Sequence, residues 1–143
     1  MFFISDKCIG CTACLRICPV EAIAGERSII HIIDSTCIDC GACGRVCPVD
    51  AIEDQYGVLQ PHMKRGEWPK PVIVAENCTG CNYCVDVCPE KCLDVLPNAE
   101  FPGVIGIAEF VNPKTCIGCR LCEDVCAKNA IIMSDTLAVR GVA

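Results

Sequence analysis

The chain has 143 residues, including 17 cysteines, and a formal net charge of −6. This length suits one domain or two small ones, and the negative charge argues against a nucleic-acid-binding protein, since no basic stripe is present to neutralise phosphates. The longest aliphatic runs, IIHII and GVIGIA, are too short to span a membrane, and the N-terminal MFFISDKC lacks the basic start of a signal peptide. We therefore expect a cytoplasmic protein, in which clustered cysteines indicate metal sites rather than disulfides.

The first half of the chain contains two cysteine-rich segments framed by short predicted strands. Residues 2–4 (FFI) predict a strand, and CIGCTACLRICPVEAI follows at 8–23. Residues 28–34 (SIIHIID) predict a hairpin arm that pairs with residues just after this segment. CIDCGACGRVCPVDAI then occupies 37–52, and 57–59 (GVL) predicts the closing strand of this half.

The second half repeats this order after a segment of linker composition. Residues 60–71 are rich in proline, which is typical of a linker. The elements that follow alternate predicted strands with two more cysteine-rich segments: a strand at 72–76, CTGCNYCVDVCPEKCL at 78–93, a long hairpin at 96–113, CIGCRLCEDVCAKNAI at 116–131 and a strand at 131–134. We therefore predict two modules, residues 1–59 and 72–143, joined by the linker at 60–71.

The four cysteine-rich segments align without gaps, and each contains C-x2-C-x2-C-x3-C. The first three cysteines form a short loop that can wrap one corner of a compact inorganic core. Glycines in these loops allow unusual dihedral angles and let backbone N–H groups approach sulfur: Gly10, Gly41, Gly80 and Gly118. The third and fourth cysteines are four residues apart, which places them one helical turn apart on one face. The motif therefore predicts a metal-binding loop followed by a short helix.

With the proline that follows it at Pro19, Pro48 and Pro89, this motif resembles the ligand run of bacterial ferredoxins for 4Fe-4S clusters. Residues 1–55 resemble a complete two-cluster clostridial-type ferredoxin, and residues 72–134 resemble a second one. The resemblance implies four 4Fe-4S clusters and an α+β fold, a tandem of ferredoxin-like dicluster modules with short antiparallel hairpins and short helical turns. Much of the stability should then come from cluster ligation.

In the ferredoxin family the fourth cysteine of each motif ligates the other cluster of the pair. Carried over to this chain, the resemblance implies four ligand sets: Cys8, Cys11, Cys14 and Cys47 for cluster 1; Cys37, Cys40, Cys43 and Cys18 for cluster 2; Cys78, Cys81, Cys84 and Cys126 for cluster 3; and Cys116, Cys119, Cys122 and Cys88 for cluster 4. Some four-cluster subunits instead pair the first motif with the fourth and the second with the third, and this alternative stays open. A zinc-binding structural module is a further alternative, although zinc takes cysteines in pairs rather than as a triplet with a distant fourth.

Two positions depart from the repeat. Cys92 lies outside the four ligand sets and takes the place of Ala22, Ala51 and Ala130, so we expect it to pack as a small apolar residue. A spare ligand or a redox thiol is the alternative. Ala127 stands where the other motifs have proline, and is either neutral or adds a backbone N–H near cluster 3.

The two histidines have no partner motif for metal binding or catalysis. His31 interrupts an apolar strand, and we expect it to face solvent. His62 lies in the predicted linker. Tyr83 lies inside the third motif, where packing against the cluster is expected.

The chain contains no nucleotide-binding loop, nucleophile elbow or H-E-x-x-H motif, so we expect electron transfer rather than substrate chemistry. We predict the small iron–sulfur subunit of a larger, anaerobic oxidoreductase: a tungsten- or molybdenum-dependent aldehyde oxidoreductase, a 2-oxoacid oxidoreductase, a hydrogenase or a formate dehydrogenase. The linker with Trp68, the 96–113 hairpin and the tail LAVRGVA add surface that a minimal ferredoxin lacks. Its redox partner protein should offer a basic patch to this acidic chain. A free, diffusible polyferredoxin is the alternative.

Overall fold

The computed structural model describes residues 1–135, which fall into two compact units divided between Trp68 and Pro69. The tail LAVRGVA lies outside the described residues, as does the end of the predicted second module. The start of the predicted linker is tied to the first unit, because Gln60 donates its backbone N–H to Ile52 and Met63 donates to Arg45. The module boundaries at 59 and 72 remain a prediction.

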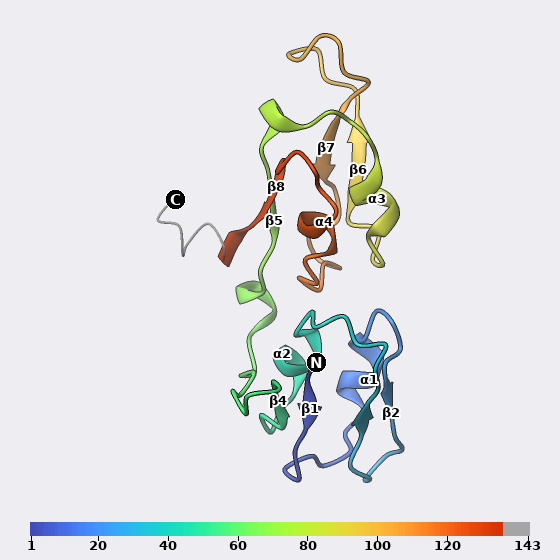
Figure 1. The fold of residues 1–143 in the computed structure, drawn as a ribbon, viewed down its shortest axis with the longest axis vertical. Helices are drawn as coiled ribbons and strands as arrows, with labels where there is room; N and C mark the ends of the chain where they lie inside the picture. The colour runs from blue at the N-terminus through green and yellow to red at the C-terminus, as the bar shows by residue number, and fades with distance from the viewer. Residues whose placement is uncertain (136–143) are drawn as a thin grey trace. The chain divides into compact units, whose positions relative to one another are not determined.

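The first unit alternates very short strands with two short helices (Figure 1). In chain order its strands and α-helices are β1 (Phe3–Ile4), α1 (Ala13–Ile17), β2 (Ile23–Ala24), β3 (Ile32–Ile33), α2 (Ala42–Val46) and β4 (Ile52–Glu53). Strand β1 pairs antiparallel with β4, and β2 pairs antiparallel with β3. A 3-10 turn at Arg65–Glu67 closes the unit.

The second unit repeats this arrangement with longer strands (Figure 1). Its strands and α-helices are β5 (Pro71–Ile73), α3 (Tyr83–Val87), β6 (Leu93–Leu96), β7 (Ile107–Phe110), α4 (Leu121–Asp124) and β8 (Ile131–Met133), with a 3-10 turn at Ala75–Asn77. Strand β5 pairs antiparallel with β8, and β6 pairs antiparallel with β7. In both units, therefore, an outer sheet pairs the first strand with the last (β1–β4 and β5–β8), and an inner hairpin follows the first helix (β2–β3 and β6–β7).

The expected α+β fold, with short antiparallel sheets and short helices, is confirmed. The predicted closing strand at residues 57–59 was wrong: the last strand of this unit is β4, directly after the second motif, and it pairs with β1. Leu59 makes only an isolated bridge to Glu53. Val58 and Leu59 are aliphatic, which favoured a strand at 57–59. However, Val58 is 56% exposed while Ile52 is almost fully buried, and the strand forms at the buried residue.

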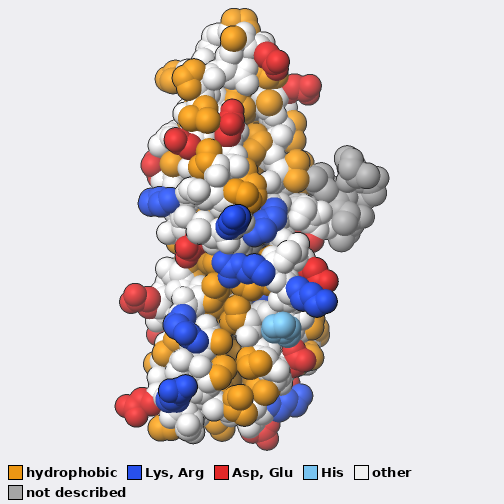
Figure 2. All heavy atoms as spheres, turned by 180° about the vertical axis from the view of Figure 1, so that it is seen from behind, with side chains coloured by type: hydrophobic (Ala, Val, Ile, Leu, Met, Phe, Trp, Pro, Cys, Tyr) orange, Lys and Arg blue, Asp and Glu red, His pale blue; other side chains and the backbone are white. Residues whose placement is uncertain are grey.

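The core of each unit is small, and cysteine makes up much of it. The first core combines aliphatic and aromatic side chains with three cysteines: Phe2, Ile23, Ile33, Ile52, Cys14, Cys43 and Cys47. In the second unit Leu93, Ile131 and Met133 pack with Cys84 and Cys122. Many large hydrophobic side chains are left outside, including Ile105 at 89% exposure, and Figure 2 shows hydrophobic (orange) surface on both units. Over residues 1–135, neither unit has the large apolar core that holds an ordinary domain of this size together.

Candidate metal centres

Each α-helix carries the third cysteine of its motif near its first turn, and the fourth cysteine follows one turn later. The residue before each helix has a left-handed backbone, with φ between 65° and 72°: Thr12, Gly41, Asn82 and Arg120. Only glycine adopts this conformation without strain, so the other three residues are held there by their surroundings. This left-handed step ends the cysteine loop abruptly and starts the helix, as the spacing predicted.

A second repeated turn follows the fourth cysteine of every motif. The residue three positions on again has a positive φ, between 48° and 53°: Glu21, Asp50, Lys91 and Asn129. The next backbone N–H then donates a hydrogen bond to the cysteine sulfur at 3.2–3.3 Å; the donors are Ala22, Ala51, Cys92 and Ala130. Two further N–H groups reach first-position sulfurs, from Gly10 to Cys8 and from Ala108 to Cys78, both at 3.4 Å. Such donors stabilise sulfur that carries negative charge.

The structure brings the sixteen motif cysteines together around four cavities, two in each unit. Site 1 is bordered by Cys8, Cys11, Cys14 and Cys47, site 2 by Cys18, Cys37, Cys40 and Cys43, site 3 by Cys78, Cys81, Cys84 and Cys126, and site 4 by Cys88, Cys116, Cys119 and Cys122. Each helix therefore borders two cavities, since Cys14 lies at site 1 and Cys18 at site 2. These quartets coincide with the predicted ligand sets, whose binding role stays a prediction.

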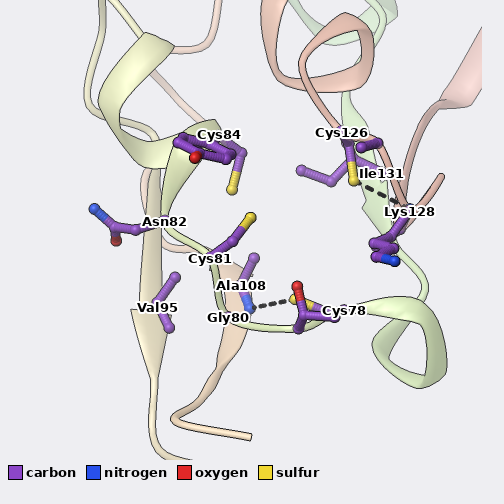
Figure 3. A pocket seen from close by; sticks show the side chains of 14 residues that line it. Cys78, Gly80, Cys81, Asn82, Cys84, Val95, Ala108, Cys126, Lys128 and Ile131 are labelled. Carbon is purple, nitrogen blue, oxygen red and sulfur yellow. Dashed lines mark hydrogen bonds between the residues drawn. The ribbon is translucent and has the colours of Figure 1, made fainter.

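Site 3 has the largest cavity, with a volume of about 150 Å³, compared with about 20 Å³ at sites 2 and 4 and about 10 Å³ at site 1. Figure 3 shows Cys81, Cys84 and Cys126 pointing into a common space, with Cys78 at its edge. The dashed lines mark the N–H bonds to Cys78 and Cys126. Cys81 is the exposed member of this quartet.

Burial keeps several of these thiols neutral in the absence of metal. Burial, and then the neighbouring Cys11 and Cys8, raise the pKa of Cys14 to about 11. Burial likewise raises the pKa of Cys43 and of Cys122 to about 12. Metal ligation needs thiolates, so cluster assembly must displace protons from these side chains.

The donor set of each cavity fits a 4Fe-4S cluster. Four cysteines border an otherwise mainly apolar cavity, and backbone N–H groups point at their sulfurs. Within residues 1–135 no three His, Cys, Asp or Glu side chains converge closely enough to hold a single metal ion. The cysteines instead border a space, as ligands at the corners of a larger group do.

Family profiles described as "4Fe-4S dicluster domain" match the chain at residues 2–54 and, with a second profile, at residues 36–92 and 77–130. The chain therefore belongs to the 4Fe-4S dicluster domain family. Sixteen cluster-type cysteines in two such dicluster repeats imply four 4Fe-4S clusters. These are electron-transfer domains of ferredoxin type.

Curated relatives match the chain over short segments. A subunit of the "Ion-translocating oxidoreductase complex" of Alcanivorax borkumensis is 50% identical over 28 residues, which is 20% of this chain and 14% of that protein. The protein of the same name from Aeromonas hydrophila is 47% identical over 32 residues, or 22% and 17% of the two chains. The matched part thus spans less than a fifth of these relatives.

Among solved structures, the chain is similar to one in the "Formate dehydrogenase - heterodisulfide reductase - formylmethanofuran dehydrogenase complex" from Methanospirillum hungatei. The identity is 23%, and the match covers 89% of this chain and 52% of that one, with a TM-score of 0.37. Within residues 1–135, no helix has the length and hydrophobicity that a bilayer crossing needs.

The prediction for His31 was wrong, because this side chain is only 2% exposed and borders site 1. Side chains alternate along a strand, and Ile32 is 71% exposed while Ile33 is buried. His31 therefore shares the inner face with Ile33, although its polarity favoured an outward position. Isoleucines stand in both alternating positions of SIIHIID, so the pattern alone does not choose the inner face; the pairing of Ile33 with Ile23 does. Tyr83 borders site 3, yet its side chain remains 62% exposed.

Two basic residues that the cysteine motif does not predict also border the sites. Arg120 lies at site 4 and forms ion pairs with Glu123 and Asp135. Lys128 lies at site 3 and is exposed. The corresponding positions of the other motifs carry unrelated residues, so no repeated pattern could have indicated either one.

Cys92 occupies the position that alanine holds in the other three motifs. It is 2% exposed, against 1–2% for Ala22, Ala51 and Ala130. Its sulfur lies 3.3 Å from the Thr115 hydroxyl and also borders site 4. Burial raises the pKa of this thiol to about 12, as it does for Cys43 and Cys122 of the predicted ligand sets, so the pKa does not distinguish packing from ligation. The alanine-like burial of Cys92 and its contact with Thr115 favour packing.

We expect Cys92→Ala to retain four clusters, because Cys88, Cys116, Cys119 and Cys122 already complete the predicted set at site 4. The measurement is iron and acid-labile sulfide per chain, which should stay at about sixteen each. Cys88→Ala is the matched control, four residues away and also buried, and should lower the count by about four. Loss of a cluster in Cys92→Ala would show that Cys92 is itself a ligand.

Proposed function

We propose that the chain is the iron–sulfur subunit of a larger oxidoreductase complex and relays electrons between a catalytic partner and a distant acceptor. Each of the four sites binds one 4Fe-4S cluster through the cysteine quartet that borders it. A bound cluster of this kind takes up and releases one electron at a time. The chain's own residues fix the positions of these clusters and supply N–H donors to their ligands.

The observation that carries this proposal is the sharing of every helix between two cavities. Cys14 and Cys18 are one turn apart on the same segment, a rise of about 6 Å, yet border different sites. The same holds for Cys84 and Cys88 in the second unit. The two clusters of each unit must therefore be close neighbours, which favours electron transfer between them. Cavities that combine motifs one and two, and three and four, support sequential rather than nested pairing.

The role as a subunit is supported by the kind of protein that the chain resembles. The curated relatives bear names of subunits of an ion-translocating oxidoreductase complex. The partner that we infer is a catalytic oxidoreductase of anaerobic metabolism, of the tungsten or molybdenum aldehyde oxidoreductase type. Four clusters suit a conduit better than a shuttle, which needs one or two. The formal charge of −6 suits a partner with a basic docking patch.

Anaerobic purification of the tagged chain from its native host tests this proposal. We expect about sixteen iron and sixteen sulfide per chain, and a second protein that remains bound through gel filtration. The control is the same purification with the tag alone. A four-cluster chain that elutes as a monomer would support the diffusible carrier instead, and a chain that contains zinc without sulfide would overturn both.

A further inference from the structure

Sites 1 and 3 are equivalent positions in the two units, and one residue distinguishes them. Both are built on the first motif of a unit, and both adjoin an inner hairpin, β2–β3 or β6–β7. The registers Ile23↔Ile33 and Leu93↔Phe110 align the two hairpins. By this alignment His31 in the first unit corresponds to Ala108 in the second. Both residues are buried, and each borders its cavity.

The imidazole ring of His31 borders a cavity of about 10 Å³ at site 1, while Ala108 borders one of about 150 Å³ at site 3. Sites 2 and 4 measure about 20 Å³ without a histidine, so the ring is one of several side chains that set the size of a cavity. Gly25 makes room for the ring, because a Cβ at this residue would lie 2.1 Å from Cδ2 of His31. Its φ of +150° also disfavours other residues. The corresponding residue in the second unit is Val95, which borders the larger cavity.

Both nitrogens of the His31 ring have hydrogen-bond partners. Nε2 lies 3.1 Å from the carbonyl oxygen of Glu26, and Nδ1 lies 3.4 Å from the sulfur of Cys14. The carbonyl oxygen of Glu26 only accepts, and so does a cysteine thiolate bound to iron. A neutral imidazole carries one hydrogen, so both contacts are hydrogen bonds in the loaded protein only when each ring nitrogen carries a hydrogen and the ring is a cation. The contact with Glu26 holds the ring so that Nδ1 faces this sulfur.

We propose that His31 sets the reduction potential of the site 1 cluster by donating a hydrogen bond from Nδ1 to the Cys14 ligand. A donor to sulfur stabilises the more negative, reduced state more strongly than the oxidised state, and this raises the potential. The ring also borders site 1, whereas Ala108 offers no side-chain donor at site 3, where the cavity is wider. The reduction potentials of the clusters at sites 1 and 3 are therefore set by different residues. This inference rests on the proposed binding of a cluster at site 1.

The test compares His31→Phe with the unaltered four-cluster protein by redox titration monitored by electron paramagnetic resonance. Phenylalanine keeps a ring in the cavity but removes both N–H donors and the positive charge that they bring, so filling of the cavity is separated from the polar contact with Cys14. We expect about sixteen iron atoms to be retained and the potential of one cluster to fall. Cys11→Ser should eliminate the same cluster from the titration. The control is His62→Phe, at an exposed histidine of the same unit, which should leave all four potentials unchanged.

The reciprocal change moves the histidine to the other unit. Val95→Gly combined with Ala108→His supplies both the ring and the space for it at site 3, and should raise the potential of a second cluster. If His31→Phe does not assemble all four clusters, this double variant tests whether a histidine at this position raises the cluster potential. Iron-loaded variants whose potentials do not move would overturn the role of His31 but leave the proposed function intact. Absence of iron from the unaltered protein would overturn the proposed function itself.

Discussion

Removal of the iron–sulfur clusters is expected to unfold both units. Anaerobic treatment with a chelator and a denaturant, followed by return to buffer, should give a chain without cooperative thermal unfolding and with most of its circular-dichroism signal lost. Reconstitution with iron and sulfide should restore both. The control is the same treatment without chelator, and a well-folded apoprotein would contradict the prediction.

The physical reason is that no element of either unit is stable by itself. The α-helices have four or five residues and the strands two to four, whereas isolated helices shorter than about 12 residues and isolated two-stranded sheets are marginal in water. Non-glycine residues in the repeated turns, such as Thr12, Asn82 and Asn129, adopt positive φ angles that cost about 1 kcal/mol or more each. Ligation must supply the free energy that offsets these terms.

The exchange of the fourth cysteine between motifs predicts an unusual pattern in double variants. Cys11 and Cys47 border site 1, while Cys40 borders site 2. Cys11→Ser with Cys47→Ser should remove one cluster, because both changes fall on the same site. Cys40→Ser with Cys47→Ser should remove two, because each change falls on a different site. Iron per chain should therefore be about twelve in the first double variant and about eight in the second.

This comparison distinguishes the possible ligand pairings without a structure of the loaded protein. If each fourth cysteine ligated the cluster of its own motif, the iron counts would be reversed. Cys11→Ser with Cys47→Ser would then retain about eight iron atoms, and Cys40→Ser with Cys47→Ser about twelve. If the first motif were paired with the fourth, Cys11→Ser with Cys126→Ser would remove a single cluster instead of two. The matching pair Cys81→Ser with Cys126→Ser repeats the test at site 3, where both cysteines border one cavity.

Much of the fold and of the sites could be predicted because the cysteine motif determines both spacing and backbone. The separation of Cys14 from Cys18 requires a helical turn, and the family resemblance places each fourth cysteine in the neighbouring site. The exact strands could not be predicted, because two-residue strands such as β4 depend on burial against the rest of the unit rather than on their own pattern. His31 was missed for a related reason: its polarity suggested solvent, and only the hairpin register places it inside.

The contacts across the hairpins, which distinguish the two units, could not be predicted from the sequence pattern either. Gly25 and Val95 occupy equivalent positions, but their meaning depends on the residue across the hairpin. A glycine in a loop is usually interpreted as a turn residue, and nothing local reveals that it leaves room for an imidazole ring. The role of Gly25 follows only from the hairpin register, which places it opposite His31 and places Val95 opposite Ala108.

The helix shared by two cavities also determines how oxidative damage should spread. If oxygen destroys the cluster at site 1, Cys14 loses its anchor, and α1 is then held only through Cys18 at site 2. Under continued exposure to oxygen the second cluster is more accessible and should fail soon after the first, whereas under the anaerobic conditions of the cysteine variants it should persist. Among the described residues every quartet lies within one unit, so such a failure should stop at the border of that unit. A partly damaged chain should therefore hold two intact clusters more often than three or one.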